Sequence, residues 1–174
     1  YFGSLVGVTL PAPVVGMVGA PHGQGYWLVG ADGAVYAFGD ARSEGSLEGT
    51  CINGPVIAMR CTPDGRGYWL FGADGGVYAF GAAGFFGSAG SLALNRPIVG
   101  VATAPDGQGY WLAAADGGVF AFGGVGFFGS AAPVSPDRPI VGMQATADGQ
   151  GYWLVGADGA VFDFGSAGFF GSAG

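Results

Sequence analysis

Short apolar runs separated by turn residues recur along the whole chain. One unit begins with Gly-Tyr-Trp-Leu, continues through Ala-Asp-Gly and resumes as Val-aromatic-X-Phe-Gly. It starts at Gly25, Gly67, Gly109 and Gly151, so successive copies are 42 residues apart. An Asp-Gly pair between two β-prone runs favours a type I′ turn, which needs positive φ at both central residues. Each copy therefore predicts a β-hairpin.

Two further segments complete the predicted repeat. A proline followed by alternating Val and Ile, as at 97–101, predicts a first strand, because proline is tolerated where a strand begins. A Phe-Phe-Gly-Ser motif follows the hairpin and predicts a short, exposed fourth strand. The motif is Tyr-Phe-Gly-Ser at residues 1–4, and at 43–46 polar Ser-Glu replaces the aromatic pair. Each repeat thus has three to four antiparallel strands.

Both faces of the predicted second strand are apolar. Tyr26 and Leu28 point to one side and Trp27 and Val29 to the other, so the strand is expected to be buried on both faces. Small sheets of this kind, repeated every 42 residues, are typical of a β-propeller, in which each blade packs between two neighbours. A β-trefoil fits four units poorly, and a β-solenoid would have shorter coils and fewer hairpins. We expect an all-β fold, a propeller of four blades.

The repeats predict a single domain over residues 1–174. The repeat units run roughly over 13–54, 55–96, 97–138 and 139–174, with 1–12 as a closing or preceding segment.

The Gly-Ser motif occurs five times, once more than four blades of a closed ring need. Its copies lie at Gly3, Gly45, Gly87, Gly129 and Gly171. We expect a monomeric ring that closes when residues 1–4 or residues 169–172 complete the last blade. Edge-mediated self-assembly, or a piece of a longer array, is the alternative, because free strand edges pair with other molecules.

Charge and hydropathy restrict the partners. The chain has twelve acidic residues, five arginines and no lysine, for a net charge of −7. Nucleic acid and anionic membranes both require a basic patch, so neither is an expected partner. No apolar run approaches the roughly 20 residues of a membrane span, and no membrane insertion is expected.

Cys51 and Cys61 fall in one repeat, at positions where the other repeats have no cysteine. This pairing favours a disulfide and an extracellular setting, provided that the chain folds back to bring the two together. Two independent buried thiols are the alternative.

The residues suggest no catalytic site, no cofactor and no metal. The repeated aspartates each precede glycine, as turn geometry requires, and one carboxylate per turn falls short of the six to eight oxygens of a calcium site. His22 is the single histidine and stands where later repeats have Asp64 and its counterparts, so it is interpreted as a turn residue. Asp163 is the one acid outside the repeat pattern, and a lone acid cannot carry out glycoside cleavage. Asp163 would bind or gate only if it faced a central channel.

The repeated aromatic pairs are the candidates for ligand recognition, because aromatic faces stack on sugar rings and fill blade cores equally well. These candidates are Tyr26, Trp27, Tyr68, Trp69, Tyr110, Trp111, Tyr152 and Trp153. Neighbouring residues of a strand alternate faces, so at least one member of each pair must be core.

The string Gly-Tyr-Trp-Leu-Val-X-Ala-Asp-Gly-Gly-Val-Phe-Ala-Phe-Gly, followed by Gly-Phe-Phe-Gly-Ser, resembles a repeat of secreted actinobacterial proteins, where it occurs in arrays or beside hydrolase domains. The resemblance covers the whole chain and implies a secreted or cell-surface protein, but no activity. The general layout is also similar to tectonin and tachylectin propeller lectins, without a close match to their motifs.

These observations together predict a non-enzymatic extracellular module that binds glycan or protein through repeated sites. A structural, self-assembling array or spacer is the alternative. An enzyme that uses the central channel is disfavoured by the shortage of histidine, lysine and paired acids.

Overall fold

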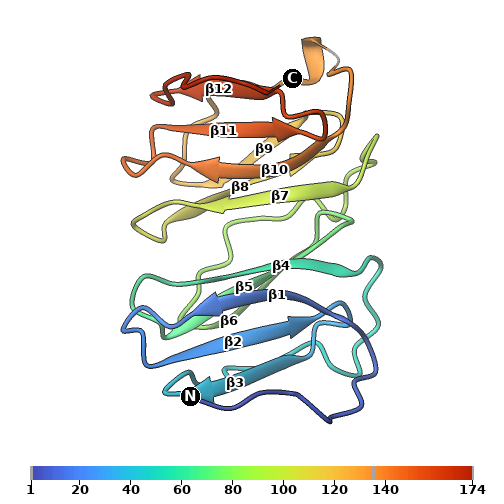
Figure 1. The fold of residues 1–174 in the computed structure, drawn as a ribbon, viewed down its shortest axis with the longest axis vertical. Helices are drawn as coiled ribbons and strands as arrows, with labels where there is room; N and C mark the ends of the chain where they lie inside the picture. The colour runs from blue at the N-terminus through green and yellow to red at the C-terminus, as the bar shows by residue number, and fades with distance from the viewer. Residues whose placement is uncertain (1, 135, 174) are drawn as a thin grey trace. The chain divides into compact units, whose positions relative to one another are not determined.

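The computed structural model describes residues 2–134 and 136–173, and in these residues twelve strands form four antiparallel sheets of three strands each (Figure 1). Tyr1, the first residue of the N-terminal motif, lies outside the described residues. We call the sheets blades 1 to 4 in chain order. The strands are β1 (Val14–Gly19), β2 (Gly25–Gly30), β3 (Val35–Gly39), β4 (Val56–Cys61), β5 (Gly67–Gly72), β6 (Val77–Gly81), β7 (Ile98–Thr103), β8 (Gly109–Ala114), β9 (Val119–Gly123), β10 (Ile140–Ala145), β11 (Gly151–Gly156) and β12 (Val161–Gly165).

The predicted hairpins are confirmed, but their turn differs from type I′. In blade 1 the N–H of Gly33 donates to the carbonyl of Gly30, which makes Ala31 and Asp32 the central residues of the turn. Gly33 follows with a φ of 80°, and the N–H of Gly30 donates to the carbonyl of Ala34. The loop therefore has three residues and needs positive φ only at its glycine.

The Asp32 carboxylate accepts the N–H of Ala34 at 3.1 Å and closes this turn.

The predicted fourth strand is absent from the described residues, and each blade ends at its third strand. The Gly-Ser segments make single hydrogen bonds to backbone groups of nearby turns and do not form a row of backbone hydrogen bonds with a neighbouring strand. In blade 3, for example, the N–H of Ala131 donates to the carbonyl of Gly117 in the hairpin turn. A single bond of this kind holds an extended segment in place without making it a strand.

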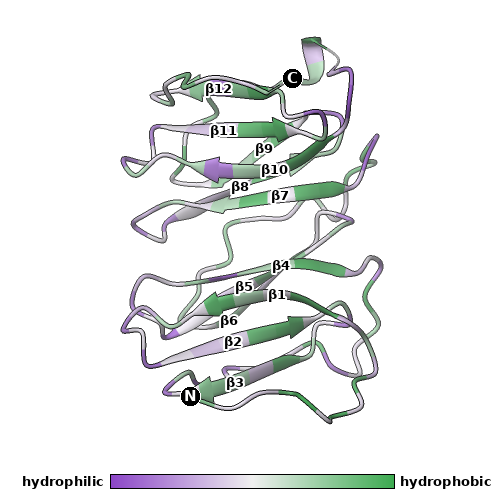
Figure 2. Cartoon of the chain, viewed as in Figure 1, coloured by the Kyte–Doolittle hydropathy of each residue, from purple (hydrophilic) through white to green (hydrophobic). Residues whose placement is uncertain are grey.

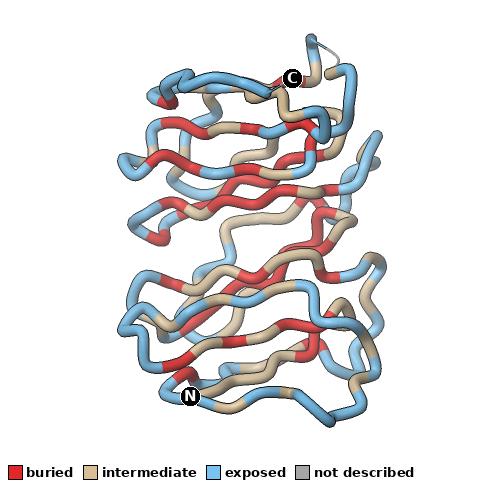
Figure 3. Tube along the Cα trace, viewed as in Figure 1, coloured by how far each residue is buried: buried red, intermediate tan, exposed pale blue. Residues whose placement is uncertain are grey.

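The chain forms two compact units, Tyr1–Phe85 with blades 1 and 2, and Phe86–Gly174 with blades 3 and 4. In the first unit β1 contacts β4, and in the second β7 contacts β10. The middle strands β5 and β8 are buried along their whole length, and the loops are mostly exposed (Figure 3). Hydropathy follows the same division, since the strands are largely apolar and the turns polar (Figure 2). The single-domain organisation stays a prediction.

Strand register gives each blade two distinct faces. In blade 1, Val18 pairs with Trp27 and Trp27 with Ala37, so these three side chains share one face, which we call the tryptophan face. The other face carries Tyr26 and Phe38, and we call it the tyrosine face.

Within each unit, the tryptophan face of the first blade packs against the tyrosine face of the second. The core of the first unit joins Trp27 and Val29 of blade 1 to Met59, Tyr68 and Leu70 of blade 2. The core of the second unit joins Trp111 and Ala113 of blade 3 to Met143, Tyr152 and Leu154 of blade 4. Burial of the tryptophan face of the first blade and of the tyrosine face of the second blade follows from this stacking.

Candidate functional site

The joint between blades 3 and 4 is made by the Gly-Ser motif that links them. The hydroxyl of Tyr152 donates to the carbonyl oxygen of Gly129 at 2.6 Å and accepts the N–H of Phe128 at 3.3 Å. Gly129 has a φ of 139° and lies directly over the ring of Phe164. The motif thus follows blade 3 in sequence and docks on the tyrosine face of blade 4.

The joint between blades 1 and 2 has the same geometry with different side chains. Tyr68 donates to the carbonyl of Gly45 at 2.5 Å and accepts the N–H of Glu44 at 3.0 Å. Because the backbone makes both bonds, Glu44 can stand where the second joint has Phe128.

The tryptophans complete the joints from the other side. Trp111 donates its indole N–H to the carbonyl of Gly126 at 2.8 Å, and its ring lies 5.8 Å from Tyr152 and 6.4 Å from Phe128. In the first unit Trp27 donates to the carbonyl of Arg42 at 2.7 Å and lies 5.8 Å from Tyr68. Buried indole groups need such partners.

Burial separates the eight aromatic candidates into two groups. Six are fully buried: Trp27, Trp69, Trp111, Tyr68, Tyr110 and Tyr152. Burial raises the pKa of Tyr110 and Tyr152, although their backbone hydrogen bonds oppose the shift. Tyr26 and Trp153 are only partly buried, so these two retain ring surface for a partner. Ligand binding by the repeated pairs stays a prediction.

Trp153 is flanked by two polar side chains on the tryptophan face of blade 4. Gln144 of β10 pairs with Trp153, and Trp153 pairs with Asp163 of β12. Both flanking residues are exposed, and β10 turns from apolar to hydrophilic at its arrowhead (Figure 2). Two residues along β11, Val155 is 37% exposed, whereas its counterpart Val29 in blade 1 is fully buried.

On the tryptophan faces of blades 1 and 3, the three cross-strand residues at the same positions are apolar, and another blade covers them. They consist of Val18, Trp27 and Ala37 in blade 1 and of Ala102, Trp111 and Ala121 in blade 3. The sequence singled out Asp163 by its departure from the repeat, but it gave no comparable signal for Gln144, whose position varies in every blade. Only the register places the two beside one tryptophan.

The last Gly-Ser segment extends this face. Trp153 donates its indole N–H to the carbonyl of Gly168 at 2.8 Å, and its ring lies 6.4 Å from that of Phe170. Phe170 is 91% exposed. We call the set Gln144, Trp153, Val155, Asp163 and Phe170 the blade-4 end face.

The turn aspartates serve the turns. The carboxylate of Asp148 accepts hydrogen bonds from Thr146 at 2.5 Å, from the N–H of Gln150 at 2.9 Å and from Ser166 at 2.9 Å. These bonds, the Thr146 bond foremost, lower the pKa of Asp148. Asp64 is held in the same way by Thr62, and its pKa is also lowered. No three metal-ligating side chains gather anywhere in residues 2–134 and 136–173.

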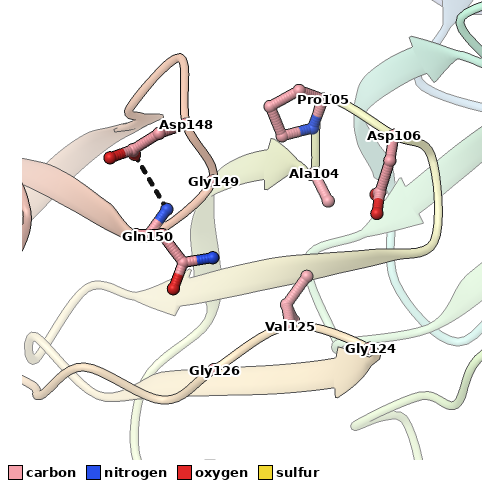
Figure 4. A pocket seen from close by; sticks show the side chains of 9 residues that line it. All are labelled: Ala104, Pro105, Asp106, Gly124, Val125, Gly126, Asp148, Gly149 and Gln150. Atoms are coloured by element: carbon pink, nitrogen blue, oxygen red, sulfur yellow. Dashed lines mark hydrogen bonds between the residues drawn. The ribbon is translucent and has the colours of Figure 1, made fainter.

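A small cavity of about 140 Å³ lies in the second unit between the turns of blades 3 and 4 (Figure 4). Asp106 and Asp148 lie on opposite sides of it, together with Gln150, Val125 and Pro105. Among the nine lining residues drawn in Figure 4, one hydrogen bond is marked, in which the Asp148 carboxylate accepts the N–H of Gln150. With neither a nucleophile nor a histidine among its described lining residues, the cavity offers acceptors for a small polar molecule or water.

The two cysteines are free thiols in the structure, Cys51 exposed and Cys61 partly buried. Cys61 lies 3.8 Å from the carbonyl of Gly19 across the blade joint, and burial raises the pKa of its thiol. A disulfide between them stays a prediction for the oxidised protein. His22 is exposed in the β1–β2 turn, as a turn residue should be.

Among the described residues, no helix is long and apolar enough to cross a membrane.

Comparison with families and with curated proteins gives no match for this sequence. Solved structures do match. The β-propeller domain of Myceliophteria thermophila Cps50 (Swd1) is 11% identical, with a TM-score of 0.58 over 89% of this chain and 54% of that one. The C-terminal WD40 domain of Sif2 is 12% identical, with a TM-score of 0.59 over 92% of this chain and 48% of that one.

The chain thus spans about half the length of the solved structures it matches. At this identity the likeness concerns the fold alone, and membership of the actinobacterial repeat family stays a prediction. The chain has four sheets of three antiparallel strands, which stack face to face within each unit. This arrangement agrees with the structural matches, and the fold is that of a β-propeller.

Proposed function

We propose that the chain is a non-enzymatic interaction module, secreted or displayed at the cell surface, and that the blade-4 end face is its recognition surface. One observation carries the proposal. Trp153 is partly exposed between Gln144 and Asp163, whereas its counterparts Trp27 and Trp111 are buried beneath a following blade.

The chemistry of this face suits recognition by a protein. Tryptophan contributes strongly to binding when a partner covers it, and surrounding polar groups set the orientation. Val155 and Phe170 enlarge the apolar area around Trp153. A protein partner with its own apolar patch would bury all three.

A glycan is the second candidate, and the row of three side chains favours it. An indole face can stack on a sugar ring, while the Gln144 amide and the Asp163 carboxylate hydrogen-bond the hydroxyl groups on either side. The resemblance to secreted repeats supports an extracellular location for either partner. The spacer hypothesis assigns no ligand to this face.

A glycan array tests the second candidate directly. The intact chain, Gln144→Ala, Asp163→Ala and Trp153→Ala would be probed in parallel, with Phe127→Ser as the control. Phe127 is an exposed aromatic of the motif that docks on the tyrosine face of blade 4, whereas Trp153 lies on the opposite, tryptophan face. A glycan retained by the control and lost by all three variants supports a glycan site. A glycan that all variants retain would place recognition elsewhere on the molecule.

A further inference from the structure

Each tyrosine face of the chain already holds one Gly-Ser motif. The four bonds are Tyr26 to Gly3, Tyr68 to Gly45, Tyr110 to Gly87 and Tyr152 to Gly129, and each hydroxyl donates to the glycine carbonyl at 2.5 to 2.6 Å. The tyrosine always follows its glycine by 23 residues, so every motif serves the repeat after it. Among residues 2–134 and 136–173, these four bonds occupy all the tyrosine faces, and none is left for the fifth motif, at Gly171.

The fifth motif nevertheless has the geometry of the others. Gly171 has a φ of 120°, which is close to the 119° of Gly3 and lies in the same positive region as the 139° of Gly129. Phe170 lies against Trp153 at the same 6.4 Å that separates Phe128 from Trp111.

What differs is the space above the glycine. A Cβ on Gly129 would lie 2.5 Å from the ring of Phe164, but a Cβ on Gly171 would meet no described atom within 4 Å. The blade-4 end face is therefore half of a joint, with its tryptophan, phenylalanine and glycine carbonyl in place.

The tyrosine face of blade 1 offers the other half. Met17 of β1 is 63% exposed, whereas its counterparts Met59 and Met143 are 1% and 9% exposed beneath a preceding blade. Tyr26 is only partly buried, and the segment that holds it is short, with Phe2 43% exposed. This face presents methionine, tyrosine and phenylalanine, as the covered faces of blades 2 and 4 do.

We propose that the blade-4 end face of one copy docks on the tyrosine face of blade 1 of a second copy. The proposal rests on the proposed function, because it names the partner of that same face. The second copy is favoured over other proteins because the tyrosine face of its blade 1 carries the same kinds of side chain as the tyrosine faces of blades 2 and 4, which complete the joints within each unit. Two copies also supply about the length of the solved propellers, of which one copy covers about half.

Two features of the chain regulate this joint. A tyrosine face holds one motif, and Gly3 already occupies the tyrosine face of blade 1. When two copies dock, either Gly3 of the copy that offers blade 1 is displaced from Tyr26, or Gly171 of the other copy stays off that face. Asp163 stands where Ala37 and Ala121 pack in the internal joints, and covering a carboxylate costs free energy. The association is consequently weaker than the internal joints, and Asp163→Ala strengthens it.

Sedimentation velocity over a wide range of protein concentration tests the proposal on the intact chain. Wild type is expected to associate reversibly, and Asp163→Ala to raise the association constant by about tenfold or more. Met17→Asp and Val155→Asp are each expected to abolish association, because either one places a charge in the joint. Phe127→Ser, the control, is expected to associate as wild type does. Circular dichroism checks that these exposed substitutions leave the fold intact.

Mixing the two charged variants determines the orientation. In a head-to-tail joint, Met17→Asp keeps a good blade-4 end face and Val155→Asp keeps a good blade-1 face, so an equimolar mixture forms a heterodimer. A joint between two identical faces uses only one of these surfaces, so one of the two variants would still form a dimer by itself, and this result would overturn the proposal.

The remaining outcomes separate the two proposals. A wild type that stays monomeric at every concentration overturns self-docking, while glycan binding that depends on Trp153 would still uphold the proposed function. Association that Val155→Asp leaves unchanged, together with an array signal indifferent to Trp153→Ala, would overturn both.

Discussion

The hydroxyl of Tyr68 donates to the carbonyl oxygen of Gly45, 23 residues earlier in the chain, at 2.5 Å. The bond fastens the segment leaving blade 1 to the face of blade 2, and the same hydroxyl also accepts the N–H of Glu44. One side-chain oxygen thus satisfies two backbone groups of the joint, and neighbouring blades are coupled through it.

Tyr68→Phe is expected to destabilise the protein by about 1–3 kcal/mol, because it leaves a part-buried carbonyl and N–H without their partner. The shift in the midpoint of urea unfolding measures this cost. Tyr36→Phe is the control, since Tyr36 is only partly buried in β3. Equal midpoints for the two variants would show that the hydroxyl of Tyr68 contributes nothing to the joint.

Trp111→Ala is expected to cost about 3–5 kcal/mol, the range for removing a large core aromatic. Its ring is fully buried against Tyr152 and Phe128. Trp153→Ala is expected to cost clearly less, because that ring is partly exposed. Thermal melts of the two variants decide the matter, and equal losses would contradict the assignment of Trp153 to an open face.

Gly129→Ala and Gly171→Ala form a matched pair at the same position of two copies of the motif. Both glycines have positive φ, so both variants carry similar backbone strain. Only the new methyl of Gly129→Ala meets an aromatic ring, that of Phe164, and we expect it to be less stable than Gly171→Ala by about 1–3 kcal/mol. Chemical denaturation compares them. A larger loss for Gly171→Ala would mean that the last motif is already packed in a joint.

The acid side of the stability profile should depend on Asp148. Its folded-state pKa is lowered by hydrogen bonds, so the carboxylate stabilises the folded protein above the unfolded pKa of about 3.9. That contribution disappears as the pH falls through the lower, folded value. Asp148→Asn is expected to flatten the loss of stability below about pH 4. Thermal melts over a pH series measure this, and Asp163→Asn is the control for the change in net charge. If the stability of Asp148→Asn falls below about pH 4 as steeply as that of the wild type, the assignment to Asp148 is wrong.

EDTA is expected to leave the melting temperature unchanged, because the carboxylates of Asp64 and Asp148 are engaged by hydroxyl and N–H groups of their own turns. Differential scanning calorimetry with and without the chelator measures this. A fall of several degrees, reversed by added calcium, would identify a metal site.

Much of the fold follows from local pattern. The apolar residues of β2 and the glycine of its hairpin predict the strands, because period and turn chemistry act over a few residues. The predicted burial on both faces holds for β5, whereas in β2 Tyr26 and Leu28 are only partly buried. The prediction of a fourth strand at the Gly-Ser motif is wrong, because the partners of the motif are isolated groups. Each of the first four glycines packs on a tyrosine and a phenylalanine of the next repeat, as Gly45 does on Tyr68 and Phe80. A separate bond joins the segment to a turn carbonyl, as between Ala131 and Gly117. Short-range pattern carries no information about such distant bonds.

The candidate site was less accessible to sequence reasoning. All four Tyr-Trp pairs look equivalent in the sequence, yet burial leaves ring surface only at Tyr26 and Trp153. Gln144 corresponds to Val18, Arg60 and Ala102, so its polarity resembles ordinary variation. Strand register alone reveals that it lies beside Trp153.

Because each Gly-Ser segment latches the repeat that follows it, the exchangeable module of this chain begins at the latch, ahead of the proline that opens each repeat. A 42-residue block cut from proline to proline would carry a latch for its successor and lack its own. A block cut from Ser43 to Gly84 would bring its latch and its tyrosine together. Duplication, deletion or grafting of blades should therefore succeed in that frame, and arrays of different length should differ by whole latch-plus-hairpin modules.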